Sequence, residues 1–305
     1  MDNHQAPFTN ADTPLATNAD AHHSPFAYAD AHHTPLTHAA RCGEAATAEG
    51  LLACGANVDE PKTNGQNVTP LQVASHYGHL HVVRLLLERG AAVNLASVGG
   101  STPLLMASLS GYGTVVRLLL ECGAAVEQAP ANGHTPLWAA CLRGCLEVVR
   151  LLSSHGANRT FTNGTTAESM ANHLGHSDTT AWLIATRHWS TPLHHLTIIT
   201  PARTRALLRD GANLFASHEG GPTPLALAQG MLAAGNAANG TVADLVLRAA
   251  RPWSPATDAL FPAAARERAR RILRVVYLVA FKYLRPGLAG VDFVGLILPF
   301  DVLRV

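Results

Sequence analysis

Residues 69–94 read TPLQVASHYGHLHVVRLLLERGAAVN, and this stretch decides the fold. Thr69 offers its hydroxyl as a helix N-cap, and Pro70 fits the first helical position, where its missing N–H costs nothing. The first helix should end at Gly78. A second helix follows with apolar residues at helical spacing, and Gly90 supplies the left-handed residue that ends it. The stretch therefore predicts a helix, a turn, a second helix and an extended finger.

The same pattern recurs along the chain with one period. The tripeptide T-P-L has spacings of 35, 33, 33, 56 and 32 residues, starting at Thr34, Thr69, Thr102, Thr135, Thr191 and Thr223. A G-A pair follows the apolar runs with spacings of 35, 33, 33 and 55, at Gly55, Gly90, Gly123, Gly156 and Gly211. Neither helix of such a unit hides its apolar side alone, so neighbouring units must stack into a continuous core.

The combined pattern G-x-T-P-L-x-x-A, followed by V-V-R-L-L-L-x-x-G-A-x-V-N, resembles the ankyrin repeat. It is strongest in the units that begin at Thr69, Thr102 and Thr135. The resemblance implies an all-α ankyrin-repeat solenoid, built of helix-turn-helix units with β-hairpin-like fingers, over residues 32–250 in about seven units. A weaker unit at 164–183 lacks its finger, because only 25 residues separate Thr166 from Thr191. We expect an irregular joint near 164–190 within one stack.

Residues 1–31 are expected to form a low-complexity, histidine-rich N-terminal tail. The motifs ADTPL (11–15), ADAHHSPF (19–26) and ADAHHTPL (29–36) repeat without hydrophobic periodicity. The pairs His22/His23 and His32/His33 are of a residue type that binds metals. No cysteine or carboxylate cluster supports a closed site, so the favoured interpretation is a leader that duplicates the start of the first repeat, with no metal.

Residues 251–305 are expected to form a C-terminal helical extension. Pro252 and Pro255 interrupt the repeat before a helix that starts near Pro262. Arginines line this helix, at Arg266, Arg268, Arg270, Arg271 and Arg274. Such a helix could contact acidic lipid or nucleic acid. The favoured interpretation is a cap whose apolar stripe covers the last repeat.

Two further resemblances concern this extension. Its W-S-P…F-P segment is similar to extensions that follow ankyrin arrays in some algal and protist proteins. The final LPFDVLRV (298–305) resembles the opening of an F-box-like helix, which implies recruitment of a ubiquitin ligase, but the sequence ends before an F-box is complete. The alternative is an apolar tail that folds back on the arginine-rich helix.

Composition limits the function classes. The 22 basic and 21 acidic side chains give a net charge of +1, which supplies no long-range field for nucleic acid. Five cysteines without a C-x-x-C indicate neither a disulfide framework nor a zinc site. The N-terminus lacks a signal peptide's apolar region, and the apolar run from Val275 to Phe281 is too short to span a bilayer. We expect a monomer in the cytoplasm or nucleus.

The sequence offers little chemistry. It contains no G-x-S-x-G, H-E-x-x-H or Walker-type loop. His194 and His195 follow T-P-L, where ankyrin units carry a histidine that bonds within the repeat. Cys141 and Cys145 have no basic or histidine partner obvious in sequence and are expected to be packing thiols. The prediction is a protein that is not an enzyme and needs no cofactor.

What remains is a binding surface. The resemblance places it on the concave face, on exposed positions of the first helices and on the finger tips. The transferred positions on the first helices are His76, Tyr77, Leu105, Leu109, Ser110, Trp138, Leu142, Arg143 and His173, and those on the fingers are Gln66, Val98, Asn132 and His134. Trp138 is the best single candidate because tryptophan supplies interface hot spots; the alternative is that it packs inside.

Two functions follow from this reading. The first is a non-enzymatic scaffold or adaptor that binds a protein partner on the concave face. The second is a substrate receptor of a ubiquitin ligase, in which the repeats hold the substrate and the C-terminal segment recruits the ligase.

Overall fold

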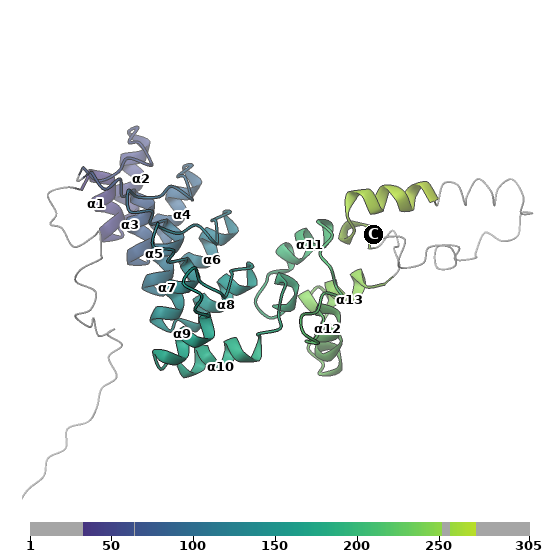
Figure 1. The fold of residues 1–305 in the computed structure, drawn as a ribbon. Helices are drawn as coiled ribbons and strands as arrows, with labels where there is room; N and C mark the ends of the chain where they lie inside the picture. The colour runs from purple at the N-terminus through teal and green to yellow at the C-terminus, as the bar shows by residue number, and fades with distance from the viewer. Residues whose placement is uncertain (1–32, 64, 252–256, 273–305) are drawn as a thin grey trace, which may run out of the picture.

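The computed structural model describes residues 33–63, 65–251 and 257–272, and their helices come in pairs (Figure 1). The first five pairs are α1 (Pro35–Cys42) with α2 (Ala45–Ala53), α3 (Pro70–Tyr77) with α4 (Leu80–Glu88), α5 (Pro103–Ser110) with α6 (Gly113–Glu121), α7 (Pro136–Arg143) with α8 (Leu146–Ser154), and α9 (Ala167–His173) with α10 (Ser177–Ala185). The 3₁₀ turn η3 (Pro192–His194) precedes α11 (Pro201–Arg209), and α12 (Pro224–Ala233) pairs with α13 (Val242–Ala249). The turn η4 (Asp258–Leu260) leads to a final helix at 263–272. The predicted all-α class is confirmed.

The threonines of T-P-L cap the first helices as predicted. Thr34, Thr69, Thr102 and Thr135 each accept a hydrogen bond through Oγ1 from the amide three residues later, at 3.1–3.3 Å. These bonds satisfy amides at the helix start that have no partner within the helix. At the other end, Gly78 adopts φ +76°, a left-handed conformation that glycine allows at no steric cost.

The paired helices stack into a solenoid. The first helices α1, α3, α5, α7 and α9 lie side by side in one row, and α2, α4, α6, α8 and α10 form a second row behind them (Figure 1). One apolar core runs between the rows, from Leu36 in α1 to Leu183 in α10. Each unit therefore buries its apolar side against its neighbours, as the repeat requires.

The fingers hold neighbouring units together through hydrogen bonds. The carboxylate of Asp59 accepts from the amide of Ala92 in the next finger, and the carboxylate of Glu127 accepts from the amide of Asn158. Within a finger, the amide of Ser97 donates to the carbonyl of Ser101 at 2.9 Å, which is the expected hairpin-like closure. The fingers thus add a polar layer along one edge of the stack.

The T-P-L at Thr191 does not start a full helix, and this corrects the prediction. It forms only the three-residue turn η3, and the chain then starts α11 at Thr200 and Pro201. Residues 197–200 read T-I-I-T before Pro201. The β-branched side chains lower helix propensity, and the residue before a proline avoids the helical conformation. The irregularity therefore falls after α10, at 186–200, since α9 and α10 form a complete pair.

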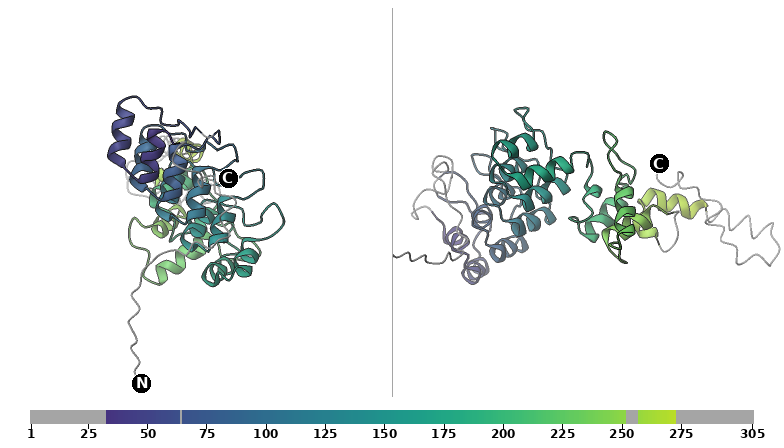
Figure 2. Two further views of the ribbon diagram at one scale, coloured as in Figure 1. Left: turned by 90° about the vertical axis from the view of Figure 1, so that its left-hand side faces the viewer. Right: turned by 90° about the horizontal axis from the view of Figure 1, so that it is seen from below.

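A second apolar core begins beyond this joint. It extends from Leu193 to Ala269 and joins η3, α11, α12, α13, η4 and the final helix. Figure 2 shows the two groups of helices from two further sides. The final helix buries Ala265 and Ala269 in this core, which agrees with a cap. Two of its arginines, Arg266 and Arg270, lie 3.9 and 2.8 Å from the carboxylate of Asp258.

Several predictions made from sequence fall on residues that the structure does not describe. These are the N-terminal tail with its paired histidines up to His32, the prolines at 252 and 255, the apolar run from 275, and the F-box-like residues 298–305. In the described part of the chain, no helix is long and apolar enough to cross a membrane.

Candidate functional site

The row of first helices forms one continuous surface, which we call the inner face (α1, α3, α5, α7 and α9). The same positions of each unit recur along it because neighbouring first helices are parallel. His76 and Leu109 are equivalent, as are Leu105 and Trp138, which both follow T-P-L. The T-P-L caps set this register, so a sequence change at one position alters one known point of the face.

A small apolar cluster lies on the inner face, and its Trp138 also packs against the main core. We call it the inner-face cluster, and it consists of Leu105, Met106, Leu109, Trp138 and Ala139. Trp138 is half-buried, and the ring of His134 stacks on it with 3.6 Å between centroids and an interplanar angle of 3°. An aromatic side chain that is held by packing and still partly open supplies binding area at low entropic cost.

The cluster arises where two units lack a polar bridge. In α3, Gln72 donates from Nε2 to the carbonyl oxygens of Leu95 and Ser101 in the following finger, at 2.8 and 2.7 Å. The equivalent residues of the next two units are Leu105 and Trp138. Leucine has no polar side-chain atom, and the tryptophan indole has one donor where the glutamine amide has two. At the position after T-P-L, two adjacent units therefore carry large apolar side chains where α3 carries a bridging glutamine.

A polar group adjoins the cluster on the N-terminal side. Ser110 Oγ and His76 Nδ1 share a hydrogen bond of 3.2 Å, and the rings of His76 and Tyr77 meet edge to face at 5.0 Å. Tyr77 stacks in turn on His79, whose Nε2 hydrogen-bonds the carbonyl of Arg41 at 2.9 Å. Three neighbouring units thus contribute to one connected patch.

Two basic residues, Arg41 and Lys62, influence the titration of this end. The Lys62 side chain is only 4% exposed, and burial together with nearby Arg41 lowers its pKa to about 8. Burial and the charge of Lys62 lower the pKa of His76 to about 4, so this imidazole is neutral at pH 7. The helices α1, α3, α5 and α7 contain no aspartate or glutamate. Lys62 is a member of this patch that sequence reasoning missed, since nothing in its finger marks it as buried.

The other predicted residues differ in their exposure. Leu142 is half-buried, Arg143 and His173 are exposed on α7 and α9, and the finger residues Asn132 and Val98 are exposed. Gln66 is half-buried in the first finger. Leu105 is only 5% exposed, which corrects the expectation that it is open, because it packs beside Met106, Trp138 and Ala139.

Cys141 and Cys145 lie in surroundings that do not activate a thiol. Cys141 is buried, and desolvation raises the pKa of its thiol to about 12. Burial also raises the pKa of Cys145. A thiol needs a lowered pKa to react as a thiolate near neutral pH, so neither residue is an activated nucleophile.

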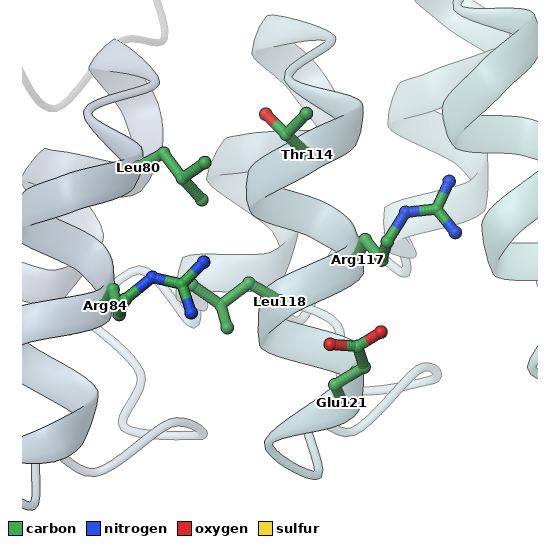
Figure 3. Close-up of a pocket in the computed structure, with 6 residues that line it drawn as sticks. All are labelled: Leu80, Arg84, Thr114, Arg117, Leu118 and Glu121. Carbon is green, nitrogen blue, oxygen red and sulfur yellow. The ribbon is translucent and has the colours of Figure 1, made fainter. Parts of the chain in front are cut away.

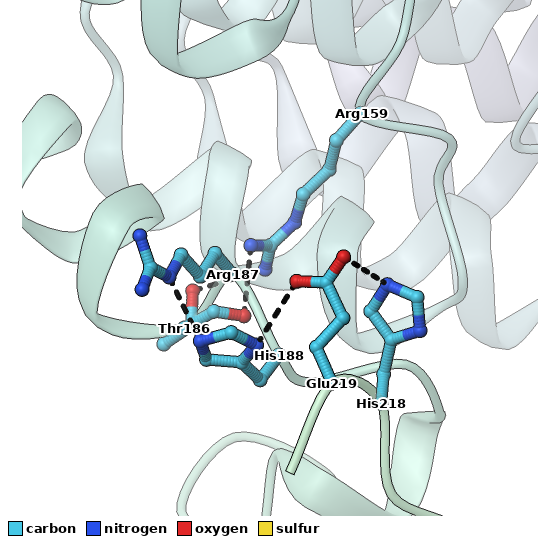
Figure 4. Close-up of polar contacts among 6 residues, drawn as sticks. All are labelled: Arg159, Thr186, Arg187, His188, His218 and Glu219. Atoms are coloured by element: carbon cyan, nitrogen blue, oxygen red, sulfur yellow. Dashed lines mark hydrogen bonds and ion pairs between the residues drawn. The ribbon is translucent and has the colours of Figure 1, made fainter. Parts of the chain in front are cut away.

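The joint after α10 contains a second polar group, which sequence reasoning did not identify. Arg159 donates from Nη1 to the carbonyls of Thr186 and Leu183, at 2.9 and 3.3 Å, and its guanidinium lies 5.3 Å from the ring centre of Trp182. These carbonyls end α10, so Arg159 caps that helix. Figure 4 shows this group, in which Glu219 lies 3.7 Å from both His188 and His218.

The back of the solenoid carries a shallow hollow of about 220 Å³ between α4 and α6. Its walls are Leu80 and Arg84 from α4 and Thr114, Leu118 and Glu121 from α6 (Figure 3). Arg117 of α6 also lines the hollow, and its Nη2 lies 3.8 Å from the carboxylate of Glu147. The hollow lies on the second row of helices, opposite the inner face, and includes none of the predicted residues.

The fold and this surface define a helical-repeat protein that presents one continuous inner face. The family model for ankyrin repeats, in three copies, matches residues 36–129 and 105–191, which together cover half of the sequence. The chain belongs to the ankyrin-repeat family. No curated protein matches the chain in a sequence comparison.

Proposed function

We propose that the chain is a non-enzymatic scaffold or adaptor that binds a protein partner on its inner face, with Trp138 at the centre of the contact. Ankyrin repeats are protein-interaction modules. The observation that supports the site is the inner-face cluster: apolar side chains around the half-buried Trp138, flanked by hydrogen-bonding groups. A desolvated apolar centre with a polar rim is the usual anatomy of a protein interface.

The test compares Trp138→Ala with a matched variant on the other row. Leu118→Ala is the control, because Leu118 is a half-buried apolar residue in the hollow behind the solenoid. Partners are first captured from native cells with the whole chain. Trp138→Ala should lower their affinity at least about 30-fold, because truncating a hot-spot tryptophan costs roughly 2 kcal/mol or more of binding free energy. A folded Trp138→Ala protein that keeps every partner would refute the site.

We further propose that the protein acts as a monomer in the cytoplasm or nucleus and does not bind nucleic acid. A net charge of +1 supports the last point, since phosphate contacts need clustered cations. Sedimentation of the whole chain, and titration with duplex DNA and RNA at low salt, test these statements. The ubiquitin-ligase alternative stays a prediction, because it depends on residues 298–305, outside the described part.

A further inference from the structure

The tripeptide Asn-Gly-Thr occurs twice in the chain, at 163–165 and at 239–241. The first copy lies just before α9, and the second lies between α12 and α13 (Figure 1). Asn163 and Asn239 are both exposed. The glycines that follow them adopt φ +79° and +81°, and a Cβ added to either would meet nothing within 4 Å. The two copies are therefore matched in sequence, exposure and backbone conformation.

An Asn-Gly pair can modify itself without an enzyme. The backbone nitrogen of the glycine attacks Cγ of the asparagine side chain, which closes a five-membered succinimide and releases ammonia. Water then opens the ring at either carbonyl, and the product is aspartate or isoaspartate, in which the main chain runs through Cβ. Glycine favours this reaction because it has no side chain to hinder the closure. The attacking nitrogen must lose its proton, so a base beside it speeds the reaction.

The two glycine amides donate to different acceptors. The amide of Gly164 donates to the carbonyl oxygen of Phe161 at 2.9 Å, and a peptide carbonyl is too weak a base to take its proton. The amide of Gly240 donates to the carboxylate oxygen Oδ2 of Asp244 at 3.0 Å. This distance lies within the reach of about 2.6–3.2 Å that a general base needs. Of the two copies, only the second has a base on the attacking nitrogen.

The two asparagine side chains are also held differently. Thr165 donates to Oδ1 of Asn163 from both its amide and its hydroxyl, at 3.0 and 2.6 Å. In the second copy, the amide and hydroxyl of Thr241 donate instead to the carbonyl of Ala238, at 3.1 and 2.7 Å. Within the described residues, the side-chain amide of Asn239 makes no hydrogen bond. Its Cγ therefore turns toward the glycine nitrogen without breaking one.

The carboxylate of Asp244 is fixed on a packed helix. Its side chain is 20% exposed, and Nη1 of Arg248 lies 3.7 Å from the same Oδ2 that accepts from the glycine. The amide of Asp244 donates to Oγ1 of Thr241, the N-cap of α13, at 3.3 Å. The helix itself is anchored in the second core through Leu245 and Val246. The base is thus held against the attacking nitrogen by its own helix.

A further Asn-Gly pair, at 132–133, resembles the first copy. The amide of Gly133 donates to the carbonyl of Pro130 at 2.9 Å, and Oδ1 of Asn132 accepts from the amide of His134 at 3.1 Å. This pair lacks both features of the second Asn-Gly-Thr copy, so it supplies a second internal comparison.

The geometry points to Asn239 as a self-modification site, which Asp244 activates toward deamidation as a general base. The carboxylate takes the proton of the Gly240 amide while this nitrogen bonds to Cγ of Asn239, and the proton leaves with the side-chain nitrogen as ammonia. Hydrolysis of the succinimide consumes one water, and nothing is oxidised or reduced. Isoaspartate adds one main-chain atom between Ala238 and Thr241, which two hydrogen bonds join, so this product loosens the start of α13.

The test incubates the whole folded chain at pH 7.5 in ¹⁸O-labelled water, which marks every residue formed by succinimide hydrolysis. Peptide mass spectrometry follows Asn239, Asn163 and Asn132 in the same sample. Conversion at Asn239 should be at least about tenfold faster than at the other two, because positioned general bases contribute about 10²–10⁴-fold in enzymes.

Two variants examine the role of the base. Asp244→Asn keeps an oxygen that accepts from Gly240 but removes the base, so it should slow conversion at Asn239 several-fold and leave Asn163 unchanged. Glu168→Gln is the matched control, since Glu168 is the acid in the first turn of α9, after the other copy. It should leave the rate at Asn239 unchanged.

Equal rates at Asn239 and Asn163 in the folded chain would overturn the inference, as would an unchanged rate at Asn239 in Asp244→Asn. Faster conversion at Asn163 in that variant would show that it is unfolded, and the native chain in urea then decides. The ratio of the two rates should fall toward one when the structure is lost, and a ratio that urea leaves unchanged refutes activation by the fold.

The effect on α13 is measured separately. Ion exchange isolates the isoaspartate form, and amide hydrogen exchange in α13 should be faster in it than in the unmodified chain. Equal exchange in the two forms would refute the loosening of this helix.

Discussion

The joint between the two cores should make the protein sensitive to mild acid, chiefly through His195. This side chain is 1% exposed and lies between two tryptophans, with ring centroids 5.8 Å from Trp182 and 5.0 Å from Trp189. Burial, followed by the charges of Arg159, His194 and His155, lowers the pKa of His195 from 6.5 to about 3. The folded protein therefore holds this imidazole neutral.

The direction of the effect follows from proton binding. Between pH 6.5 and about 3, the unfolded chain binds a proton at His195 that the folded chain does not. The free energy of unfolding is therefore not reduced by His195 above pH 6.5, and it falls as the pH is lowered below that value. Each pH unit below 6.5 costs about 1.4 kcal/mol, so His195 alone costs roughly 2 kcal/mol at pH 5.0. His155 and His76, whose pKa values are lowered to about 4, act in the same direction.

The measurement is urea unfolding of the native chain and of His195→Leu at pH 7.5 and pH 5.0, followed by tryptophan fluorescence. Leucine keeps most of the volume, and Nδ1 of His195 has no hydrogen-bond partner that would be orphaned. The free energy of unfolding should fall between the two pH values by about 2 kcal/mol less in the variant than in the native chain. His173→Gln, at an exposed position, is the matched control and should follow the native chain. Equal losses in native and His195→Leu protein would refute the reasoning.

Three further predictions concern the repeat itself. Gln72→Ala removes the bridge to the next finger and should lower the free energy of unfolding by about 2–3 kcal/mol, measured by urea titration. Gly78→Ala should destabilise more than Gly90→Ala: both positions have positive φ, but a Cβ at Gly78 meets the ring of the next unit's tyrosine, while nothing lies within 4 Å at Gly90. Equal melting temperatures would contradict this. Iodoacetamide at pH 8 should modify the exposed Cys122 and spare the buried Cys141, and labelling of both at one rate in native protein would count against the assignment.

The fold followed from local rules where those rules agree. Thr69 and its equivalents are caps, Gly78 and its equivalents are stops, and the apolar period demands stacking, so three independent signals predict one arrangement. At Thr191 the same cap and proline precede T-I-I-T-P, and local sequence overrides the repeat pattern. The sequence contains the signal for this difference: Pro201, nine residues after Pro192, supplies a competing helix start.

The sequence predicted which positions lie on the inner face, but not how exposed each one is. Aligning the repeats placed Trp138, His76 and Ser110 on one face, because equivalent residues of stacked units must be neighbours. It did not show that Leu105 is covered by its neighbours, or that Lys62 is buried beside His76. Exposure depends on what the adjacent unit contributes, and a one-unit pattern does not contain that information.

By itself, the sequence determined the period, the helix boundaries and the row on which each side chain lies, because these depend on contacts within a few residues. The tertiary structure decided which polar groups meet across units. Arg159 ends α10, His195 lies between two tryptophans, and the core divides after Leu183. These contacts join residues that are far apart in the chain, and only the stacking of complete units brings them together.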